Sequence, residues 1–377
     1  MKNNKILIDI SYVKDEDLTK SIPLYCKRLI QSLPKDIRDQ ITLLVHPTFK
    51  KTCKALFPDY KTKVLWLFKR GKKTKGVHLI LYKISYCFLK HLIKKGHYDV
   101  YLNPQDISLY SHDKLPCRKI IVVHDLKSIK KDYLASELQK KYTKSYYHEN
   151  IKTSDVVVAI SSYTKMDILN NFQDIEEGKI KVIYNSVVLA NKSVKPKGID
   201  GNKYILYVNT LIPYKNVKTL LQAYSHIKDE IEEKLVVVGR NTEYWNNEML
   251  KFIEQEGLLG RVQRFENITD EELRWLYEHA SLFVTTSLHE GFGYTPIEAS
   301  LCECPVISSR SESLPDVTKE LLWYYEPAQD AQELSKAIIK ILQAPPSRTK
   351  LQKTKEVFSE LYSPSKLGAD FREILNN

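Results

Sequence analysis

Two glutamates eight positions apart, Glu290 and Glu298, flank a glycine-containing segment of the chain. The apolar, β-branched run 282–286 precedes them and predicts a buried strand. A helix is predicted from Thr295, which places one carboxylate in a loop and the other in the first helical turn. Backbone N–H groups and the positive helix end at such a turn favour an anionic ligand. The segment therefore predicts a site for a phosphorylated, polyhydroxylated molecule.

The same segment also has a purely local structural interpretation. Residues 295–298 fit the capping-box pattern, with a proline in the favoured first helical position, so Glu298 could serve only as a helix cap. Gly291 and Gly293 could serve only to supply the positive φ of a tight turn. Glu290 precedes the predicted cap and has no such local role, which makes it the stronger candidate for chemistry.

Glu290 through Glu298 resembles the E-x7-E motif of the retaining family 4 glycosyltransferases (glycosyl transferases group 1), which have the two-domain GT-B fold. Other segments resemble the family in the same order along the chain, so the resemblance covers nearly all of it. The ordered set is far more specific than any single motif. The additional segments are 122–126 and 157–161 in the first half, and 206–216, 236–239, 270–280, 305–308 and 313–317 in the second.

The resemblance implies a role for each residue of the motif. Lys215 would contact the diphosphate of a nucleotide-sugar donor, Glu290 the hydroxyls of the transferred sugar, and Glu298 the ribose diol. Cations and N–H dipoles at the diphosphate would be the largest catalytic contribution, because the leaving nucleotide gains negative charge. The resemblance thus assigns catalysis to Glu290, His124 and Asp125, and donor binding to Lys215, Glu298, Gly291, Phe292, Gly293, Thr295 and Asn209.

These assignments have structural alternatives, and they imply a mechanism. Lys215–Asn216 could be an ordinary helix start, and His124–Asp125 an ordinary strand end. The family retains the anomeric configuration, and the sequence identifies no nucleophilic carboxylate for a double displacement. We therefore expect front-face attack, with the leaving phosphate accepting the acceptor's proton. No cofactor or metal is expected, because Lys215 and helix dipoles can take the place of a metal; the one Asp-x-Asp, at 15–17, is expected to be a solvated acidic loop.

The chain departs from the family pattern on the donor side. The family usually has an arginine beside a glycine where this chain has Asn209–Thr210, and it often has a basic residue where this chain has Tyr214. Lys215 would then be the only charged phosphate ligand of its segment, unless Arg240 or Arg310 contributes.

Two further departures concern glycine. The family commonly carries a glycine-rich loop after its first strand, close to donor and acceptor. The corresponding residues here, 18–25, contain no glycine, which hinders close backbone approach to a substrate. Glu303 stands where a glycine is usual, and nothing in the sequence explains it.

Length and composition are typical of a folded globular protein. A chain of 377 residues with 43% hydrophobic and 28% charged residues predicts two globular domains. No apolar run reaches the roughly 18 residues that a spanning helix needs, and the first residues lack the features of a secretory signal. The six cysteines are scattered, as expected for reduced thiols. We expect a cytoplasmic protein.

Charge is concentrated in the first half of the chain. Residues 1–190 contain 35 Lys and Arg against 19 Asp and Glu, and residues 191–377 contain 23 against 27. The basic, amphipathic stretch Lys69–Lys95 is typical of helices that lie on anionic membranes, each near-surface cation adding roughly 1 kcal/mol. The alternative is a core helix with a solvated lysine edge. No nucleic-acid-binding signature accompanies the basic residues, and we expect no nucleic-acid partner.

Alternating strand and helix patterns predict an α/β protein of GT-B architecture, with two Rossmann-like, doubly wound domains facing across a cleft. The predicted parts are an acceptor-binding domain 1–190, a linker 191–202, a nucleotide-sugar-binding domain 203–355, and a C-terminal helix 356–377 that crosses back to the first domain. Strands are predicted in the first domain at 5–10, 41–45, 64–67, 99–102, 119–124, 155–160 and 181–184, and helices at 22–33, 77–95 and 163–172.

Three functions fit these features. The leading hypothesis is a retaining, metal-independent glycosyltransferase of the hexosyl type. It would move a sugar from a nucleotide-diphosphate donor to a saccharide acceptor, expected to be lipid-linked, at the inner face of the cell membrane in surface polysaccharide or glycolipid assembly. The second is a catalytically weak sugar-nucleotide-binding scaffold of the same fold. The third is a sugar-nucleotide epimerase, which the E-x7-E context disfavours.

Overall fold

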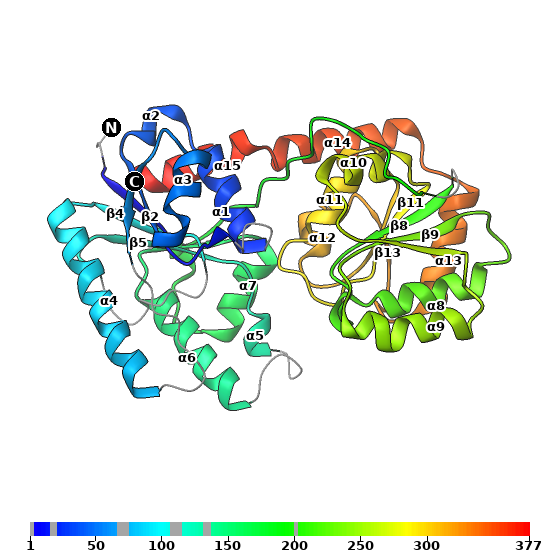
Figure 1. Ribbon diagram of the computed structural model, residues 1–377, viewed down its shortest axis with the longest axis horizontal. Helices are drawn as coiled ribbons and strands as arrows, with labels where there is room; N and C mark the ends of the chain where they lie inside the picture. The colour runs from blue at the N-terminus through cyan, green and yellow to red at the C-terminus, as the bar shows by residue number, and fades with distance from the viewer. Residues whose placement is uncertain (1–3, 16–20, 66–74, 106–114, 131–136, 200–202) are drawn as a thin grey trace. The chain divides into compact units, whose positions relative to one another are not determined.

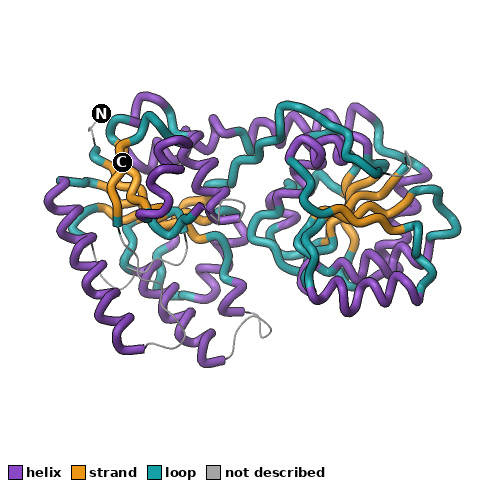
Figure 2. Tube along the Cα trace, viewed as in Figure 1, coloured by secondary structure: helices purple, strands orange, loops and turns teal. Residues whose placement is uncertain are grey.

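Figure 1 shows the computed structural model of the protein, which describes residues 4–15, 21–65, 75–105, 115–130, 137–199 and 203–377. The chain divides into two compact units. Unit 1 contains Met1–Ser186 and Pro364–Asn377, and unit 2 contains Val187–Ser363. Each unit has one parallel sheet in its middle with helices on both faces, which is the α/β architecture predicted from the sequence (Figure 2).

The described part of unit 1 contains a seven-stranded sheet in the order β3-β2-β1-β4-β5-β6-β7, with every pair of neighbours parallel. The central strands are buried along almost their whole length because helices cover both faces of the sheet. The edge strand β3 alternates exposed and half-buried residues instead. The strands are β1 (Ile6–Ile10), β2 (Ile41–Val45), β3 (Lys61–Val64), β4 (Val100–Asn103), β5 (Arg118–Val123), β6 (Val156–Ala159) and β7 (Ile180–Val182).

One strand prediction in unit 1 was wrong. The apolar pattern placed a strand at 64–67, but β3 ends at Val64 and consists mainly of Lys and Thr residues. An edge strand pairs on one side only and is partly solvated, so hydrophobic periodicity does not mark it. Residues 66 and 67 lie outside the described part of the chain.

Helices cover both faces of the sheet of unit 1 (Figure 1). Helices that connect strands in the direction of β3 lie on one face, and helices that connect strands in the direction of β7 lie on the other. Right-handed crossovers place α1 and α3 on one face and α4, α6 and α7 on the other. The C-terminal helix α15 packs beside α1, and a Cβ at Gly368 would lie 2.0 Å from the carbonyl oxygen of Ser32. The helices are α1 (Ser21–Ser32), α2 (Lys35–Arg38), α3 (Lys50–Leu56), α4 (Lys75–Gly96), α5 (Lys127–Lys130), α6 (Glu137–Lys152), α7 (Ser162–Asn171) and α15 (Pro364–Asn376).

Unit 2 has a parallel sheet in the order β10-β9-β8-β11-β12-β13, so the strand order reverses between β8 and β11. In open α/β sheets, ligands bind beyond the carboxyl ends of the strands at such a reversal. The strands are β8 (Tyr204–Val208), β9 (Lys234–Val238), β10 (Val262–Phe265), β11 (Leu282–Thr285), β12 (Val306–Ser309) and β13 (Trp323–Tyr325).

Helices cover both faces of the second sheet as well. In Figure 1, α8, α9 and α13 lie on one face, and α10, α11 and α14 lie on the other. Buried apolar side chains of α8 and α13 form one core cluster with β8, β9 and β11. The helices are α8 (Val217–Ile227), α9 (Leu250–Gln255), α10 (Asp270–His279), α11 (Tyr294–Leu301), α12 (Leu314–Val317), α13 (Ala331–Gln343) and α14 (Arg348–Leu361).

The chain passes between the units at other positions than predicted. The predicted terminal helix 356–377 is interrupted, because α14 ends at Leu361 within unit 2 and α15 begins at Pro364 within unit 1. A residue that precedes proline is disfavoured in helical conformation, which accounts for the break. Much of the predicted linker belongs to unit 2; the N–H of Val194, for example, donates to the carbonyl of Glu271 at 3.1 Å.

None of the helices within the described ranges is both long enough and apolar enough to span a bilayer. The longest, α4, has 22 residues.

Candidate donor site in unit 2

The loop after β11 and the loop after β8 meet at the carboxyl edge of the second sheet. Lys215 follows β8 and Glu290 follows β11, and these strands are parallel neighbours. The Nζ atom of Lys215 lies 2.5 Å from Oε1 of Glu290, and the two side chains are 13% and 15% exposed. The structure therefore places together the cation and the acid that the sequence analysis assigned to one ligand.

The backbone of Lys215 is anchored on both strands. Its carbonyl oxygen accepts the hydroxyl of Tyr207 at 2.8 Å and that of Thr286 at 3.1 Å. Asn216 has a left-handed backbone with φ 56° and immediately precedes α8. The predicted alternative, a helix start at this position, is thus realised, and the same turn directs the lysine side chain at Glu290.

The predicted cap of α11 was wrong. The helix begins at Tyr294, with Gly293 in the N-cap position and no side-chain cap, so Thr295 lies within the first turn. Glu298 accepts a hydrogen bond at 3.1 Å from the hydroxyl of Tyr277 on α10. Burial beside Glu298 raises the pKa of Tyr277 well above its usual value, so this tyrosine remains a proton donor.

The turn before α11 requires one of its two glycines for conformational reasons. Gly293 has φ 83°, and a Cβ there would lie 2.6 Å from Cδ2 of Leu314. Phe292 is 3% exposed, and its ring meets that of Tyr362 edge-on at 5.5 Å. The ring of Phe292 is therefore part of the core, and only its backbone is a candidate for ligand contact.

The other predicted donor residues lie nearby or are engaged elsewhere. Asn209 follows β8, and its side-chain amide donates to the hydroxyl of Ser287 at 3.2 Å, in the loop that leads to Glu290. Arg310 is paired with Glu320, at 2.8 Å and 3.1 Å, instead of with the motif. Arg240 is exposed directly after β9.

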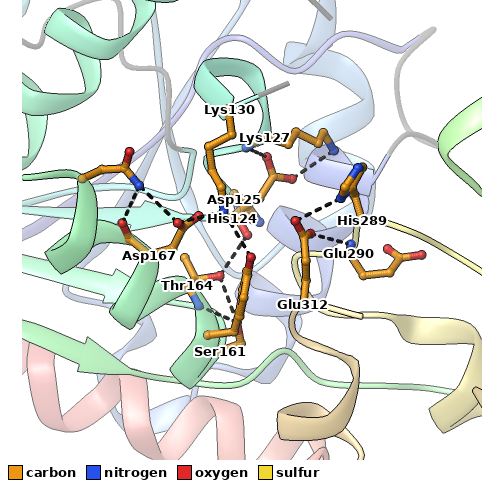
Figure 3. Close-up of polar contacts among 12 residues, drawn as sticks. His124, Asp125, Lys127, Lys130, Ser161, Thr164, Asp167, His289, Glu290 and Glu312 are labelled. Carbon is orange, nitrogen blue, oxygen red and sulfur yellow. Dashed lines mark hydrogen bonds and ion pairs between the residues drawn. The ribbon is translucent and has the colours of Figure 1, made fainter. Parts of the chain in front are cut away.

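Sequence reasoning missed the contact that Glu312 makes with the motif. Figure 3 shows the carboxylate of Glu312 between the ring of His289 and the backbone of Glu290. Glu312 lies 3.0 Å from Nδ1 of His289 and accepts the N–H of Glu290 at 3.1 Å. No local pattern signals this contact, because it joins the loops after two different strands.

The two predicted residues of unit 1 follow β5. His124 lies with Nε2 3.0 Å from the carbonyl oxygen of Pro104, and its ring meets Tyr25 edge-on at 4.7 Å. Asp125 forms an ion pair with Lys127 at 2.9 Å and accepts the N–H of the same residue (Figure 3). The cleft predicted between the two domains stays a prediction.

Lys130 in unit 1 forms an ion pair that the sequence analysis did not predict. Lys130 Nζ lies 2.9 Å from Asp167 and 3.1 Å from the hydroxyl of Tyr163. Burial by itself would lower the pKa of Lys130, but these hydrogen bonds outweigh the effect of burial, so the pKa of Lys130 is raised.

The acidic segment 15–17 lies largely outside the described ranges, and no group of three or more His, Cys, Asp or Glu side chains in the described part of the chain could hold a metal ion.

Two doubly wound units of this kind make up the GT-B fold of glycosyltransferases. The crystal structure of Anabaena Alr3699/HepE in complex with UDP and glucose shares this fold, with a TM-score of 0.73 and 17% identity over 99% of both chains. Residues 190–357 match the family model described as Glycosyl transferases group 1. The match covers most of unit 2 and includes Lys215, Glu290 and Glu298.

Two curated proteins are similar in sequence. The O-antigen chain mannosyltransferase RfbU of Salmonella typhimurium is 29% identical over 270 residues, which is 71% of this chain and 72% of that protein. The O-antigen chain mannosyltransferase B of Escherichia coli is 25% identical over 235 residues. The match covers 60% of this chain and 61% of the E. coli protein.

Proposed function

We propose that the protein transfers a mannosyl or related hexosyl residue from a nucleotide-diphosphate sugar to a saccharide acceptor in the assembly of a surface polysaccharide, with retention of configuration and without a metal. The observation that carries this proposal is the Lys215–Glu290 pair, which lies at the carboxyl edge of a doubly wound sheet beside the start of α11. The sequence similarity to O-antigen mannosyltransferases supports the class of sugar and product.

The ion pair provides a mechanism by exchange of partners. A bound diphosphate competes with Glu290 for the ammonium group of Lys215, and the released carboxylate then accepts hydroxyls of the donor sugar. The lysine and the N–H groups at the start of α11 stabilise the charge that develops on the leaving diphosphate. In the proposed mechanism these groups supply the positive charge at the diphosphate, so no metal ion is needed there.

The other residues of unit 2 complete the donor site. Glu298, held by Tyr277, retains acceptor capacity for the ribose diol. The backbone N–H groups of residues 291–293 face the diphosphate, and Asn209 adds an uncharged donor. His124 and Asp125 act on the sugar and the acceptor, and the leaving phosphate takes the acceptor's proton.

Substitution of Glu290 tests the proposal. Purified protein is incubated with GDP-mannose or UDP-glucose, and both transfer to oligosaccharide acceptors and slow hydrolysis of the donor are measured. Glu290→Gln keeps the size of the side chain but removes its charge, and we expect transfer to fall about 100-fold or more. Glu320→Gln is the matched control, because Glu320 pairs with Arg310 instead of with Lys215.

Three outcomes decide between the candidates. Near-parental transfer by Glu290→Gln would remove this residue from the mechanism. Tight donor binding by the parent protein with no transfer and no hydrolysis would favour the scaffold function. Conversion of the donor to another nucleotide sugar, with no acceptor consumed, would favour an epimerase.

The outward face of α4 supports a peripheral location at an anionic membrane, where a lipid-linked acceptor would be available. Tyr86, Leu89 and Ile93 of this helix belong to the core, so the core-helix alternative holds for one side of it. On the other side, Ile84 and Phe88 are 56% and 52% exposed, and Lys90, Lys94 and Lys95 belong to the same helix. An apolar strip with basic neighbours is the pattern of helices that lie in a membrane interface.

Vesicle flotation tests this location. Binding to phosphatidylglycerol vesicles should exceed binding to phosphatidylcholine vesicles and fall with added salt. Ile84→Glu with Phe88→Glu should abolish flotation, whereas Leu259→Glu, at a 70% exposed residue of unit 2, should not. Equal loss of flotation in the α4 double variant and in Leu259→Glu, or flotation that does not depend on lipid charge, would exclude α4 as the membrane contact.

A further inference from the structure

Glu312 bridges two consecutive residues of the E-x7-E segment. One carboxylate oxygen lies 3.0 Å from Nδ1 of His289, and the other accepts the backbone N–H of Glu290 at 3.1 Å (Figure 3). The side chains of Glu312 and His289 are 16% and 15% exposed. The bridge is thus largely shielded from water, where charge-assisted hydrogen bonds are strongest.

The neighbouring residues extend this bridge into a clamp. The hydroxyl of Ser313 donates to the carbonyl oxygen of Glu290 at 2.8 Å, so both peptide groups that flank the Cα of Glu290 are held. The hydroxyl of Ser309 donates to the carbonyl oxygen of Ser287 at 2.7 Å. Because β11 and β12 are parallel neighbours, the segment after β12 lies along the segment after β11 and holds it at several points.

A glutamate at position 312 is unfavourable in two respects. Its backbone is left-handed, with φ 48°, a conformation that glycine adopts without strain. Its carboxylate also contacts the backbone of Glu290, which adds a negative charge beside a site proposed to bind a diphosphate. A glycine would avoid both penalties, so the contribution of Glu312 lies in what its carboxylate holds.

We propose that Glu312 is a positioning residue for sugar transfer, an inference that rests on the proposed function of the site. Its carboxylate fixes the backbone of Glu290 and thereby aims the Glu290 side chain. A carboxylate only accepts hydrogen bonds, so Nδ1 of His289 carries the proton in this pair and the ring orientation is set. Displacement of a reacting group by about 1 Å can cost about 100-fold in rate, which sets the scale of the expected effect.

Glu312→Gly separates positioning from folding, because the substitution relieves backbone strain while it removes the carboxylate. Glu303→Gly is the matched control: Glu303 also has a left-handed backbone, with φ 58°, and pairs with Lys355 outside the motif. We expect Glu312→Gly to retain or raise the melting temperature. Its kcat for transfer should fall about 10- to 100-fold, and its KM for the donor should change less than about threefold. Glu303→Gly should keep parental kcat.

A readout that needs no turnover accompanies the kinetics. Hydrogen exchange at the Glu290 amide should quicken in Glu312→Gly and not in Glu303→Gly, because only the first loses the acceptor of that N–H. Glu312→Gln keeps an oxygen that can accept the Glu290 N–H. It should therefore restore slow exchange and recover part of the lost kcat.

Three results would overturn the positioning role. They are parental kcat in Glu312→Gly, unchanged exchange at Glu290, and a loss of kcat that merely follows a fall in melting temperature. Failure of the proposed function is distinguishable, because the parent protein itself would then show neither transfer nor donor hydrolysis.

Discussion

A double-mutant cycle on Lys215 and Glu290 tests the central contact of the candidate donor site. At the 2.5 Å that separates Nζ and Oε1, an effective dielectric constant of about 20 gives an attraction of about 7 kcal/mol. Desolvation of two mostly buried ions offsets several kcal/mol of this attraction. We expect Lys215→Met to destabilise unit 2 by about 3 kcal/mol, since it leaves a carboxylate without its cation. The coupling energy with Glu290→Gln should be about 1–3 kcal/mol.

The assay compares the parent, the two single variants and the double variant. Urea unfolding is followed by hydrogen exchange in peptides of unit 2, so that unit 1 does not contribute to the transition. Lys203–Glu232 is the control pair; it lies in the same unit at 2.7 Å but is 61% and 79% exposed. Water screens such a pair, and its variants should show additive effects.

GDP affinity, measured for the same four proteins, should respond differently to the two single substitutions. Lys215→Met should weaken GDP binding at least about tenfold, or about 1.4 kcal/mol, because it removes the proposed phosphate ligand. Glu290→Gln should not weaken it, because the lysine is released from its partner. Additive stability effects for Lys215 and Glu290, or equal weakening of GDP binding by both single variants, would refute the partner-exchange mechanism.

Three further predictions follow from the geometry. Tyr277→Phe removes the hydroxyl that Glu298 accepts, so it should cost about 1–3 kcal/mol and weaken nucleotide binding; calorimetry with GDP that finds parental affinity would contradict the ribose role of Glu298. Gly293→Ala should lower the melting temperature, because φ is 83° and Leu314 blocks the Cβ, whereas Gly178→Ala, with open space around it, should not. Transfer activity should survive excess chelator; loss that only Mg²⁺ or Mn²⁺ restores would contradict the metal-independent mechanism.

Most of the fold could be predicted from the sequence, because the patterns that indicate its strands and helices are local. Parallel strands buried on both faces appear as short apolar runs, as in β1, β2 and β9, and helices appear between them as longer periodic patterns. The failures occur where solvation or tertiary contact overrides the pattern. The edge strand β3 carries lysines, and the break between α14 and α15 lies inside a stretch that was predicted as one helix.

The candidate site was accessible in part. The E-x7-E spacing and the position of Lys215 after a strand identified the residues that meet at the edge of the second sheet. The capping pattern at 295–298 was misleading, because Gly293 occupies the N-cap position and Glu298 turns to Tyr277 instead. A four-residue pattern cannot show that a buried hydroxyl from another helix competes for the same carboxylate.

The amino-acid sequence by itself determined most of the secondary structure of this protein, its two-part α/β organisation and the loops that carry ionisable residues, since these depend on near neighbours in the chain. Only the tertiary structure decided which loops meet. The clamp of Glu312 on Glu290 exists because β11 and β12 lie side by side, and that order follows from the packing of the whole unit, not from the sequence between these two glutamates.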